Sequence, residues 1–561
     1  MTTPNIPAAK RAGLPVDLAR LTADGDQWLS PEERYALKTH GVCAQAQPGV
    51  FMIRCRTGGS VPTASARAIA DLSDVHASGW IHLTTRQQME LHHVDAGDVT
   101  TVLDGIRRAG LTTRSACGHT MRGVMSCPDA GVGLEEPFDC HPDATAAAES
   151  ILARTPELDT KLPSRVNVHF GGCTECRNIA KVNDAGFVSI IGDDGDLGYE
   201  LWVGGSLGKS VPTLAIKALD FVSRRDVLPA LNALFDVYIE HGDFEQPTKA
   251  RMKFLVRRLG AASFVELFLH AYERARERAW PEPTKLSTPL SASIAEILSV
   301  APEGGWSSGV RPQRVPGWAM VTVNVPLGDL RGDELRIMCD IADDIADGHL
   351  HLTRNQNVMF RWVPLAAIPA VRAALSTVGL GIEGADQARD VAVCTGGPVC
   401  SLALTPAQSL AARLLDHPAL VRNSDLQVKI SGCPNACAQH QIADLGFSGG
   451  KVTISGTSML GYQVWLGGDL ATDSIGRVVG RVADPDVPAI TEAIVGAWEA
   501  LRDRGETLSA TVARLGIEGF KAQIAAVFKG RWEPGPEPED VVRLAPMLEV
   551  DRRLPLLTGG A

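Results

Sequence analysis

The stretch Gly41-Val42-Cys43-Ala44-Gln45-Ala46-Gln47-Pro48-Gly49 returns in the same chain as Gly309-Val310-Arg311-Pro312-Gln313-Arg314-Val315-Pro316-Gly317, a displacement of 268 residues. The run Thr85-Arg86-Gln87-Gln88 returns at the same displacement as Thr353-Arg354-Asn355-Gln356. Two later segments also match, residues 168–173 with 428–433 and residues 198–207 with 461–470. Four matches in the same order predict an internal duplication.

The two copies are too long to be units of a solenoid, so we expect a duplicated module with pseudo-twofold symmetry that can enclose a site between its halves. Apolar runs at residues 50–53 and 319–325 predict a strand in each copy. We expect a helix after each strand. The apolar residues recur at helical spacing in both copies, at Ile69, Leu72 and Val75 and at Leu335, Met338, Ile341 and Ile345. Each half is therefore expected to be α+β.

Length and composition favour a soluble protein of several domains. The chain has 561 residues, more than one hydrophobic core needs, and no apolar stretch approaches the roughly 20 residues of a membrane-spanning helix. Residues 1–14 lack the apolar run of a secretory signal, so we expect a cytoplasmic protein that does not bind membranes. The net charge of −11 argues against broad binding to nucleic acid.

The strongest chemical signal is four cysteines in two pairs. Cys394-Thr-Gly-Gly-Pro-Val-Cys400 is followed by Cys433-Pro-Asn-Ala-Cys437. Thiolates are soft ligands, and four of them suit a cubane iron–sulfur cluster or zinc. The five residues between Cys394 and Cys400 exceed the usual zinc spacing, which favours the cluster. Pro434 predicts the first turn of a helix, with Cys433 and Cys437 one turn apart.

These cysteine pairs, with Gln439 and the run Ala443-Asp444-Leu445-Gly446-Phe447, resemble the assimilatory nitrite and sulfite reductases that use sirohaem and a [4Fe–4S] cluster. The likeness extends from about residue 38 to residue 529. It implies that Cys394, Cys400, Cys433 and Cys437 are the cluster ligands, and that Cys437 also bridges the cluster to the sirohaem iron. The implied reaction is the six-electron reduction of nitrite to ammonia or of sulfite to sulfide.

The same resemblance implies ferredoxin-like half-domains and two sirohaem and 4Fe-4S-type α/β domains, within a chain that works as a monomer. The expected boundaries are an N-terminal extension at 1–38, a first ferredoxin-like half-domain at 39–115, a sirohaem domain at 116–285, a linker at 286–306, a second half-domain at 307–385, a cluster domain at 386–530 and a tail at 531–561. The linker and the tail are both expected from their Pro-rich composition.

A small anion above an electron-rich macrocycle needs fixed positive charge. By resemblance Arg86, Arg122, Arg165 and Asn167 are the substrate contacts. Arg165 departs from the family, which commonly has lysine there, and it removes an ammonium that gives up a proton more easily. Sulfite reductases tend to have lysine at the position of Asn167 and nitrite reductases asparagine, so this residue favours nitrite.

Further residues are predicted to contact the sirohaem: Cys437, Arg354, Gln356, Gly204, Gly205 and Lys253. Residues 204–210 look like a phosphate loop, but Val203 stands where that motif needs glycine, so we expect a backbone turn near the macrocycle. The basic residues at 249–258 either approach the sirohaem carboxylates or form a solvated helix face. No dinucleotide-binding motif is evident, so electrons should come from ferredoxin.

Several alternatives stay open at this stage. Cys43, Cys117, Cys127, Cys140, Cys173 and Cys176 have no assigned role, and packing is favoured over a second metal because Cys173 and Cys176 lack the spacing of the other pair. A ring-contracting precorrin monooxygenase of cobalamin synthesis shares the fold and a cluster. Measuring the sirohaem content would distinguish such an enzyme from a reductase. A bare electron carrier would have no need of the arginines.

Overall fold

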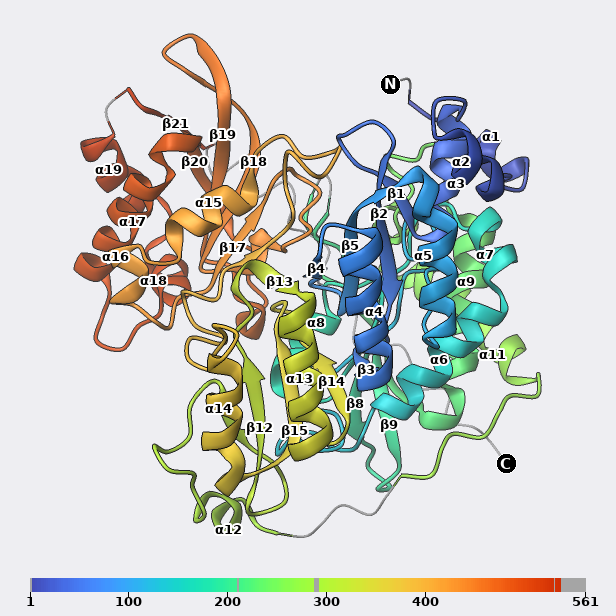
Figure 1. Ribbon diagram of the computed structural model, residues 1–561, viewed down its shortest axis with the longest axis horizontal. Coiled ribbons are helices and arrows are strands. Elements are labelled where there is room, and N and C mark those ends of the chain that lie inside the picture. The colour runs from blue at the N-terminus through green and yellow to red at the C-terminus, as the bar shows by residue number, and fades with distance from the viewer. Residues whose placement is uncertain (1–2, 209–210, 287–291, 529, 536–561) are drawn as a thin grey trace.

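The computed structural model describes residues 3–208, 211–286, 292–528 and 530–535, and their strands form four sheets (Figure 1). The first sheet has the order β1 (Val42–Ala44), β2 (Val50–Arg56), β5 (Gln88–Asp95), β4 (Trp80–Leu83), β13 (Asp329–Arg331). The second has the order β11 (Val310–Pro312), β12 (Trp318–Val323), β15 (Val358–Pro364), β14 (His349–Leu352), β3 (Ser60–Pro62). Both predicted strands are present, and the duplicated α+β fold is confirmed.

The two ferredoxin-like halves exchange one strand each. β13 from the second half pairs antiparallel with β4, and β3 from the first half pairs antiparallel with β14. One continuous apolar core runs through both halves, from Leu21 to Ile382. Since each sheet takes an edge strand from the other copy, neither half is complete alone.

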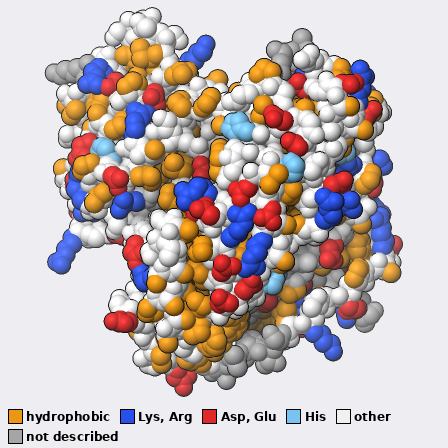
Figure 2. All heavy atoms as spheres, in the orientation of Figure 1, with side chains coloured by type: hydrophobic (Ala, Val, Ile, Leu, Met, Phe, Trp, Pro, Cys, Tyr) orange, Lys and Arg blue, Asp and Glu red, His pale blue; other side chains and the backbone are white. Residues whose placement is uncertain are grey.

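Helices α4 (Thr63–His76) and α13 (Gly332–Ile345) follow the exchanged strands and lie side by side (Figure 1). Their ion pairs are reciprocal: Arg67 contacts Asp340 and Asp343 at 2.7 Å, and Arg336 contacts Asp71 and Asp74 at 2.6 and 2.8 Å. Figure 2 shows positive and negative side chains gathered near the middle of the same face, where Figure 1 places α4 and α13. The equivalent charged residues are 269 positions apart, not 268.

The displacement between the two copies therefore increases from 268 to 269 residues part-way through the half-domains. Gly41 and Gly309 accept equivalent strand bonds at displacement 268, but Gln87 and Gln356, at φ 54° and 68°, occupy the same left-handed turn position at displacement 269. The extra residue lies in the connection between β12 and β13. The sequence match of Arg86 with Arg354 is thus wrong in space, where Asn355 is the counterpart of Arg86.

The third and fourth sheets belong to the two α/β domains and share the topology of five strands, to which the fourth sheet adds a sixth. Their orders are β10 (Ile216–Ser223), β9 (Leu197–Val203), β8 (Ala185–Ile191), β7 (Val168–Gly171), β6 (Met125–Ser126), and β16 (Ala392–Val393), β17 (Val428–Ser431), β18 (Leu445–Ile454), β19 (Thr457–Leu466), β20 (Arg477–Ala483), β21 (Trp532–Pro534). The first three strands of each sheet in chain order are parallel, so their carboxyl ends meet at one edge.

Helices cover these sheets and close two separate cores. The first domain has α6 (His141–Ala153), α7 (Thr155–Lys161), α8 (Thr174–Ala180), α9 (Val227–His241), α10 (Met252–Leu259) and α11 (Ala261–Arg276); the second has α15 (Ala407–Leu414), α16 (Pro418–Val421), α17 (Val487–Leu501), α18 (Leu508–Leu515) and α19 (Glu518–Val527). The half-domains add α5 (Val99–Arg108) and α14 (Ile368–Ser376). No described helix is long and apolar enough to cross a membrane.

The terminal and linking segments are more ordered than their composition predicts. The N-terminal extension folds into α1 (Ile6–Arg11), α2 (Leu18–Asp24) and α3 (Pro31–Leu37). The linker contains α12 (Ile294–Leu298), and the expected tail begins with β21, which pairs antiparallel with β20. Residues 287–291 of the linker and 536–561 of the tail lie outside the described residues.

Candidate functional site

Parallel pairing of β16 and β17 brings the four predicted cluster cysteines together. Cys394 directly follows β16, and Cys433 lies two residues beyond β17, where the amide of Gly432 donates to Cys394 Sγ at 3.2 Å. Burial raises the pKa of Cys394, and the nearby thiols of Cys437 and Cys433 raise it further. Mutual repulsion among thiolates in so small a space is relieved when a cationic metal centre binds them.

Glycines allow the backbone segments around the four cysteines to pack closely. A Cβ on Gly432 would lie 3.0 Å from the Cα of Gly396, and one on Gly449 would lie 2.0 Å from Thr405 Oγ1. The predicted helix after Cys433 is wrong: the chain turns instead, with Ala436 at φ 58° and Gln439 at φ 60°. Left-handed residues interrupt a right-handed helix, and these turns wrap the chain closely round the thiols. The donor set and the space fit a [4Fe–4S] cluster.

All four predicted substrate residues come together at one edge of the first α/β domain. Arg86, in the turn after β4, donates to the carbonyl of Gly123 at 2.8 Å. The backbone of Arg122 donates to Val166 at 3.0 Å, and this pairing places Arg122 beside Arg165 and Asn167. Arg86 Nε, Arg122 Nε and Asn167 Oδ1 are buried and have no hydrogen-bond partner among the described residues.

Positive charge is in surplus at this edge. Burial, and after it Arg122, lowers the pKa of Arg86 to about 9. Burial, Arg251 and Arg122 together lower the pKa of Arg165 to about 9. Asp184 is held by Arg251 at 2.7 Å and so cannot neutralise the whole group. Unpartnered donors beside uncompensated charge are the features of a site for an anion.

Cys437 links the arginines to the cysteine group. Thr85, adjacent to Arg86, donates its hydroxyl to the Cys437 carbonyl at 2.6 Å. Cys437 is also within electrostatic range of Arg165. Cys437 is exposed, whereas Cys433 is buried and Cys394 and Cys400 are half-buried. The cysteine with these contacts to Thr85 and Arg165 is the one predicted to bridge the cluster to sirohaem.

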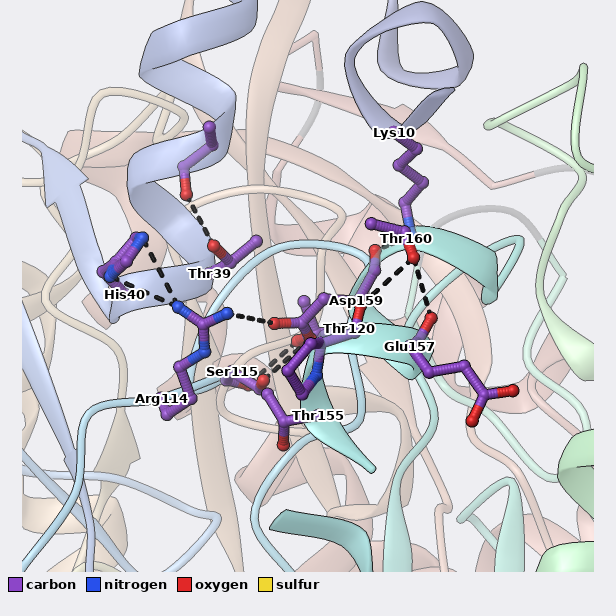
Figure 3. Close-up of polar contacts among 12 residues, drawn as sticks. Lys10, Thr39, His40, Arg114, Ser115, Thr120, Thr155, Glu157, Asp159 and Thr160 are labelled. Atoms are coloured by element: carbon purple, nitrogen blue, oxygen red, sulfur yellow. Dashed lines mark hydrogen bonds and ion pairs between the residues drawn. The ribbon is translucent and has the colours of Figure 1, made fainter. Parts of the chain in front are cut away.

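A polar network anchors the loop that carries Arg122 (Figure 3). Lys10 in α1 donates to the carbonyls of His119, Asp159 and Leu162 at 2.7, 2.7 and 2.6 Å. Ser115 donates to Asp159 Oδ1 at 2.7 Å. The N-terminal extension thereby helps to fix Arg122, a role that its sequence did not indicate.

The predicted sirohaem contacts divide into two groups. Gly204 and Gly205 lie at the arginine edge, where a Cβ on Gly205 would lie 2.3 Å from the Lys181 carbonyl. Lys253 is buried there too, and it donates to the carbonyls of Gly208 and Val211 at 3.2 and 2.7 Å. The solvated-face interpretation is thus wrong for Lys253.

Arg354 and Gln356 are not brought to the arginine edge. Arg354 pairs with Glu175 and lines a separate cavity of about 730 Å³. Gln356 is buried and donates to the carbonyls of Leu83 and Val393 at 2.7 and 2.8 Å. The one-residue shift of the repeat explains why Arg354 does not occupy the position equivalent to Arg86.

Asp184 is a site residue that the sequence prediction missed, whereas its partner Arg251 belongs to the basic segment 249–258 that the sequence indicated. Asp184 accepts the Asn167 amide at 2.8 Å and pairs with Arg251. Asp444 accepts the Gln427 amide at 3.0 Å in the other half. The shared Asp-x-Gly-Phe pattern at residues 184–187 and 444–447 was the signal that could have found it.

Comparison with known families fits this geometry. The model of the nitrite and sulphite reductase 4Fe-4S domain matches residues 117–275 and 384–531, and that of the nitrite/sulfite reductase ferredoxin-like half domain matches residues 44–109 and 311–378. The chain belongs to the nitrite and sulphite reductase family. Both models match twice, once in each copy of the duplication.

Individual members of the nitrite and sulphite reductase family are distant in sequence. A ferredoxin–nitrite reductase of Synechococcus elongatus is 28% identical over 83% of this chain and 90% of its own length. A ferredoxin sulfite reductase of Mycobacterium tuberculosis is also 28% identical, over 83% and 82%. The solved structure of the Mycobacterium tuberculosis NirA protein covers 92% of this chain and 98% of its own, with a TM-score of 0.77 and 24% identity, and so shares the fold. Equal identity to a nitrite and a sulfite reductase leaves the choice of anion to the site.

Proposed function

We propose that the protein is a ferredoxin-dependent reductase of nitrite, which it converts to ammonia with sirohaem and a [4Fe–4S] cluster as cofactors. The observation that carries the proposal is the meeting of Arg86, Arg122 and Arg165 with Cys437, the exposed residue of the four-cysteine group. An anion site beside a cluster ligand suits reduction of a bound anion. It does not suit an electron carrier, which needs no such site.

In this proposal Cys394, Cys400, Cys433 and Cys437 hold the cluster, and Gly204 and Gly205 allow close approach of the macrocycle. When bound, the two cofactors supply electrons one at a time to the anion. The glycine turns and the Thr85 contact to Cys437 hold the backbone around the cofactor sites in place. Lys253 donates to the carbonyls of Gly208 and Val211, and so supports the backbone near Gly204 and Gly205.

The arginines bind the anion and stabilise charge on its oxygens. Their guanidinium N–H groups are directional donors, already partly held by the backbone at Gly123 and Ala116. Burial, and after it Arg251, lowers the pKa of Arg165 to about 9, so its guanidinium still carries its positive charge at neutral pH. Arg165 therefore binds the anion as a fixed charge where the family commonly has lysine.

Asn167 supports nitrite over sulfite. Its backbone amide donates to Asp184 at 2.8 Å, and its side-chain amide N–H can donate to an oxygen of the anion. A neutral amide suits a monoanion, whereas a doubly charged oxyanion gains more from a lysine. Electrons come from ferredoxin, and because the duplication already supplies both halves, the active form is a monomer.

The test begins with an optical spectrum and iron and sulfide analysis of anaerobically purified protein. Turnover is then measured with nitrite and with sulfite, using reduced ferredoxin as donor and NADPH alone as the negative control. We expect a sirohaem spectrum and a higher kcat/KM for nitrite. A higher kcat/KM for sulfite would contradict the choice of anion, and a cluster without tetrapyrrole would indicate the precorrin monooxygenase.

The variant Asn167→Lys tests the specificity argument. The added ammonium should raise the ratio of sulfite to nitrite kcat/KM by about tenfold, the equivalent of about 1.4 kcal/mol. Steady-state kinetics with both anions measure this ratio. The matched control is Asn178→Lys in α8, which lies outside the arginine group and should leave the ratio unchanged. An unchanged ratio in Asn167→Lys would remove Asn167 from the specificity site.

A further inference from the structure

Three cysteines of the first α/β domain form a compact thiol group. The Sγ atoms of Cys127, Cys173 and Cys176 all lie within 4.8 Å of one another. Among the residues that the structure describes, no other set of three His, Cys, Asp or Glu side chains has ligand atoms this close. Cys127 and Cys176 are buried, and Cys173 is half-buried.

The group occupies the pseudo-twofold counterpart of the cluster site. Cys127 directly follows β6 as Cys394 follows β16, and Cys173 lies two residues beyond β7 as Cys433 does beyond β17. In both sites a backbone amide also donates to the first sulfur, from positions that differ by one residue. The Cys173 amide donates to Cys127 Sγ at 3.4 Å, and the Gly432 amide donates to Cys394 Sγ at 3.2 Å.

The short distances between the three Sγ atoms favour a single ion over a second cubane cluster. Thiolates that share one tetrahedral zinc at about 2.3 Å are about 3.8 Å apart. Cysteines of a cubane bind separate irons and must stand further apart, as the wider four-cysteine group does. Cys173 and Cys176 also have two intervening residues, a usual zinc spacing.

A candidate fourth ligand and a compensating positive charge lie near the three thiols. Glu136 is buried; its Oε1 accepts the Gly133 amide at 3.2 Å, while Oε2 is buried without a partner. Oε2 and the Cys127 Cβ flank the same position, 2.9 and 3.7 Å from a Cβ placed on Gly172. Arg354 lies within electrostatic range of Cys176, which favours an anionic metal–thiolate centre. Cys173 lines the 730 Å³ cavity, through which an ion can reach the thiol group.

We propose that Cys127, Cys173 and Cys176 bind one zinc ion or a similar thiophilic divalent cation, with Glu136 Oε2 completing the coordination. The ion ties the loop after β6 to the start of α8, and so fixes the wall of the cavity beside Arg354. Binding releases the thiol protons and leaves the metal in its divalent state, so no oxidant or reductant is needed. The site is independent of the proposed reaction.

The test measures zinc and iron per chain in full-length protein from zinc-supplemented cells. We expect about one zinc per chain beside the cluster iron. In Cys173→Ala and Cys176→Ala zinc should fall by more than about tenfold, while iron is unchanged. The matched control is Cys339→Ala, which removes a buried thiol from α13 and should keep the zinc.

A second measurement does not depend on the cysteine variants folding. Native protein stripped of zinc by a chelator is titrated with Co²⁺, and thiolate-to-cobalt charge-transfer absorption reports binding. Glu136→Gln should weaken Co²⁺ affinity by about tenfold or more. No zinc and no cobalt–thiolate absorption, or a disulfide between two of the three cysteines by mass spectrometry, would overturn the site. Unchanged affinity in Glu136→Gln would overturn the fourth ligand.

Discussion

At the scale of single residues, the arginine edge depends on donors that the protein itself leaves unpartnered. Arg86 and Arg122 each satisfy part of the guanidinium with backbone carbonyls and keep Nε free. Desolvating such groups is costly unless a ligand pairs with them. These unpartnered donors therefore favour binding of an anion at the site.

Arg86→Gln should lower kcat for nitrite by about 10²-fold to 10³-fold, because one preorganised donor to the developing charge is lost. Steady-state kinetics measure the effect, and the cofactor absorption should be unchanged. Arg107→Gln is the control, since that arginine is exposed and pairs with Asp104 on the surface. Near-normal turnover in Arg86→Gln would exclude direct contact with the anion.

Gly449→Ala should abolish cluster retention, because its Cβ would lie 2.0 Å from Thr405 Oγ1 and 2.5 Å from the Gly432 carbonyl. The neighbouring Gly450→Ala is the matched control, as its Cβ would meet nothing within 4 Å. Iron and sulfide content of the two purified variants decides the question. Full iron content in Gly449→Ala would show that the turns near the cysteines can open.

At the scale of elements, the exchanged strands β3 and β13 hold the two halves together. Leu330 in β13 is fully buried and pairs in register with Ile81 of β4. His82 and Asp329 add a contact of 2.6 Å between the same two strands. The strand that completes each sheet thus carries core side chains of the opposite copy.

Leu330→Ala should lower the free energy of unfolding by about 2–5 kcal/mol, through the lost transfer energy and the cavity left behind. Denaturant unfolding followed by circular dichroism measures the change. Val75→Ala is the control: the helical pattern predicted Val75 on the core face of α4, but it is 72% exposed, so its change should stay within about 0.5 kcal/mol. Equal effects of the two variants would mean that β13 contributes little to the core.

At the scale of the whole molecule, histidines distributed over every domain are held neutral by burial. Burial lowers the pKa to about 4 or about 3 in His40, His119, His169, His351 and His440. For His440 burial is the only cause of the lowered pKa. Each of these residues binds a proton in the unfolded chain at a higher pH than in the folded protein.

Stability should therefore fall as the pH drops from about 6.5, the unfolded pKa of histidine, towards about 3, the folded pKa of His440. Above that window the unfolded histidine is neutral too, and the penalty vanishes. Thermal unfolding midpoints over this range should fall less steeply in His440→Gln than in the wild type. His270→Gln, at an exposed position of α11, should follow the wild type. A parallel decline in His440→Gln would refute a neutral His440.

The sequence alone determined the duplication, the α+β class and the cysteine spacing, because repeats, apolar periodicity and ligand spacing are local properties of the chain. It also indicated Arg86, Arg122, Arg165 and Asn167, through short motifs. The tertiary structure alone decided how the copies fit together. Strand exchange, and a one-residue shift between β12 and β13 that separates Arg354 from the position of Arg86, depend on long-range pairing.

The same distinction applies to the thiols. Spacing along the chain identified Cys394, Cys400, Cys433 and Cys437, but Cys127 and the pair at 173 and 176 are separated by a strand and two helices. Their convergence follows from parallel pairing of β6 with β7, which brings the carboxyl ends of two distant strands to one edge. Contacts made by that pairing have no signature in any local stretch of sequence, so only the folded structure could reveal them.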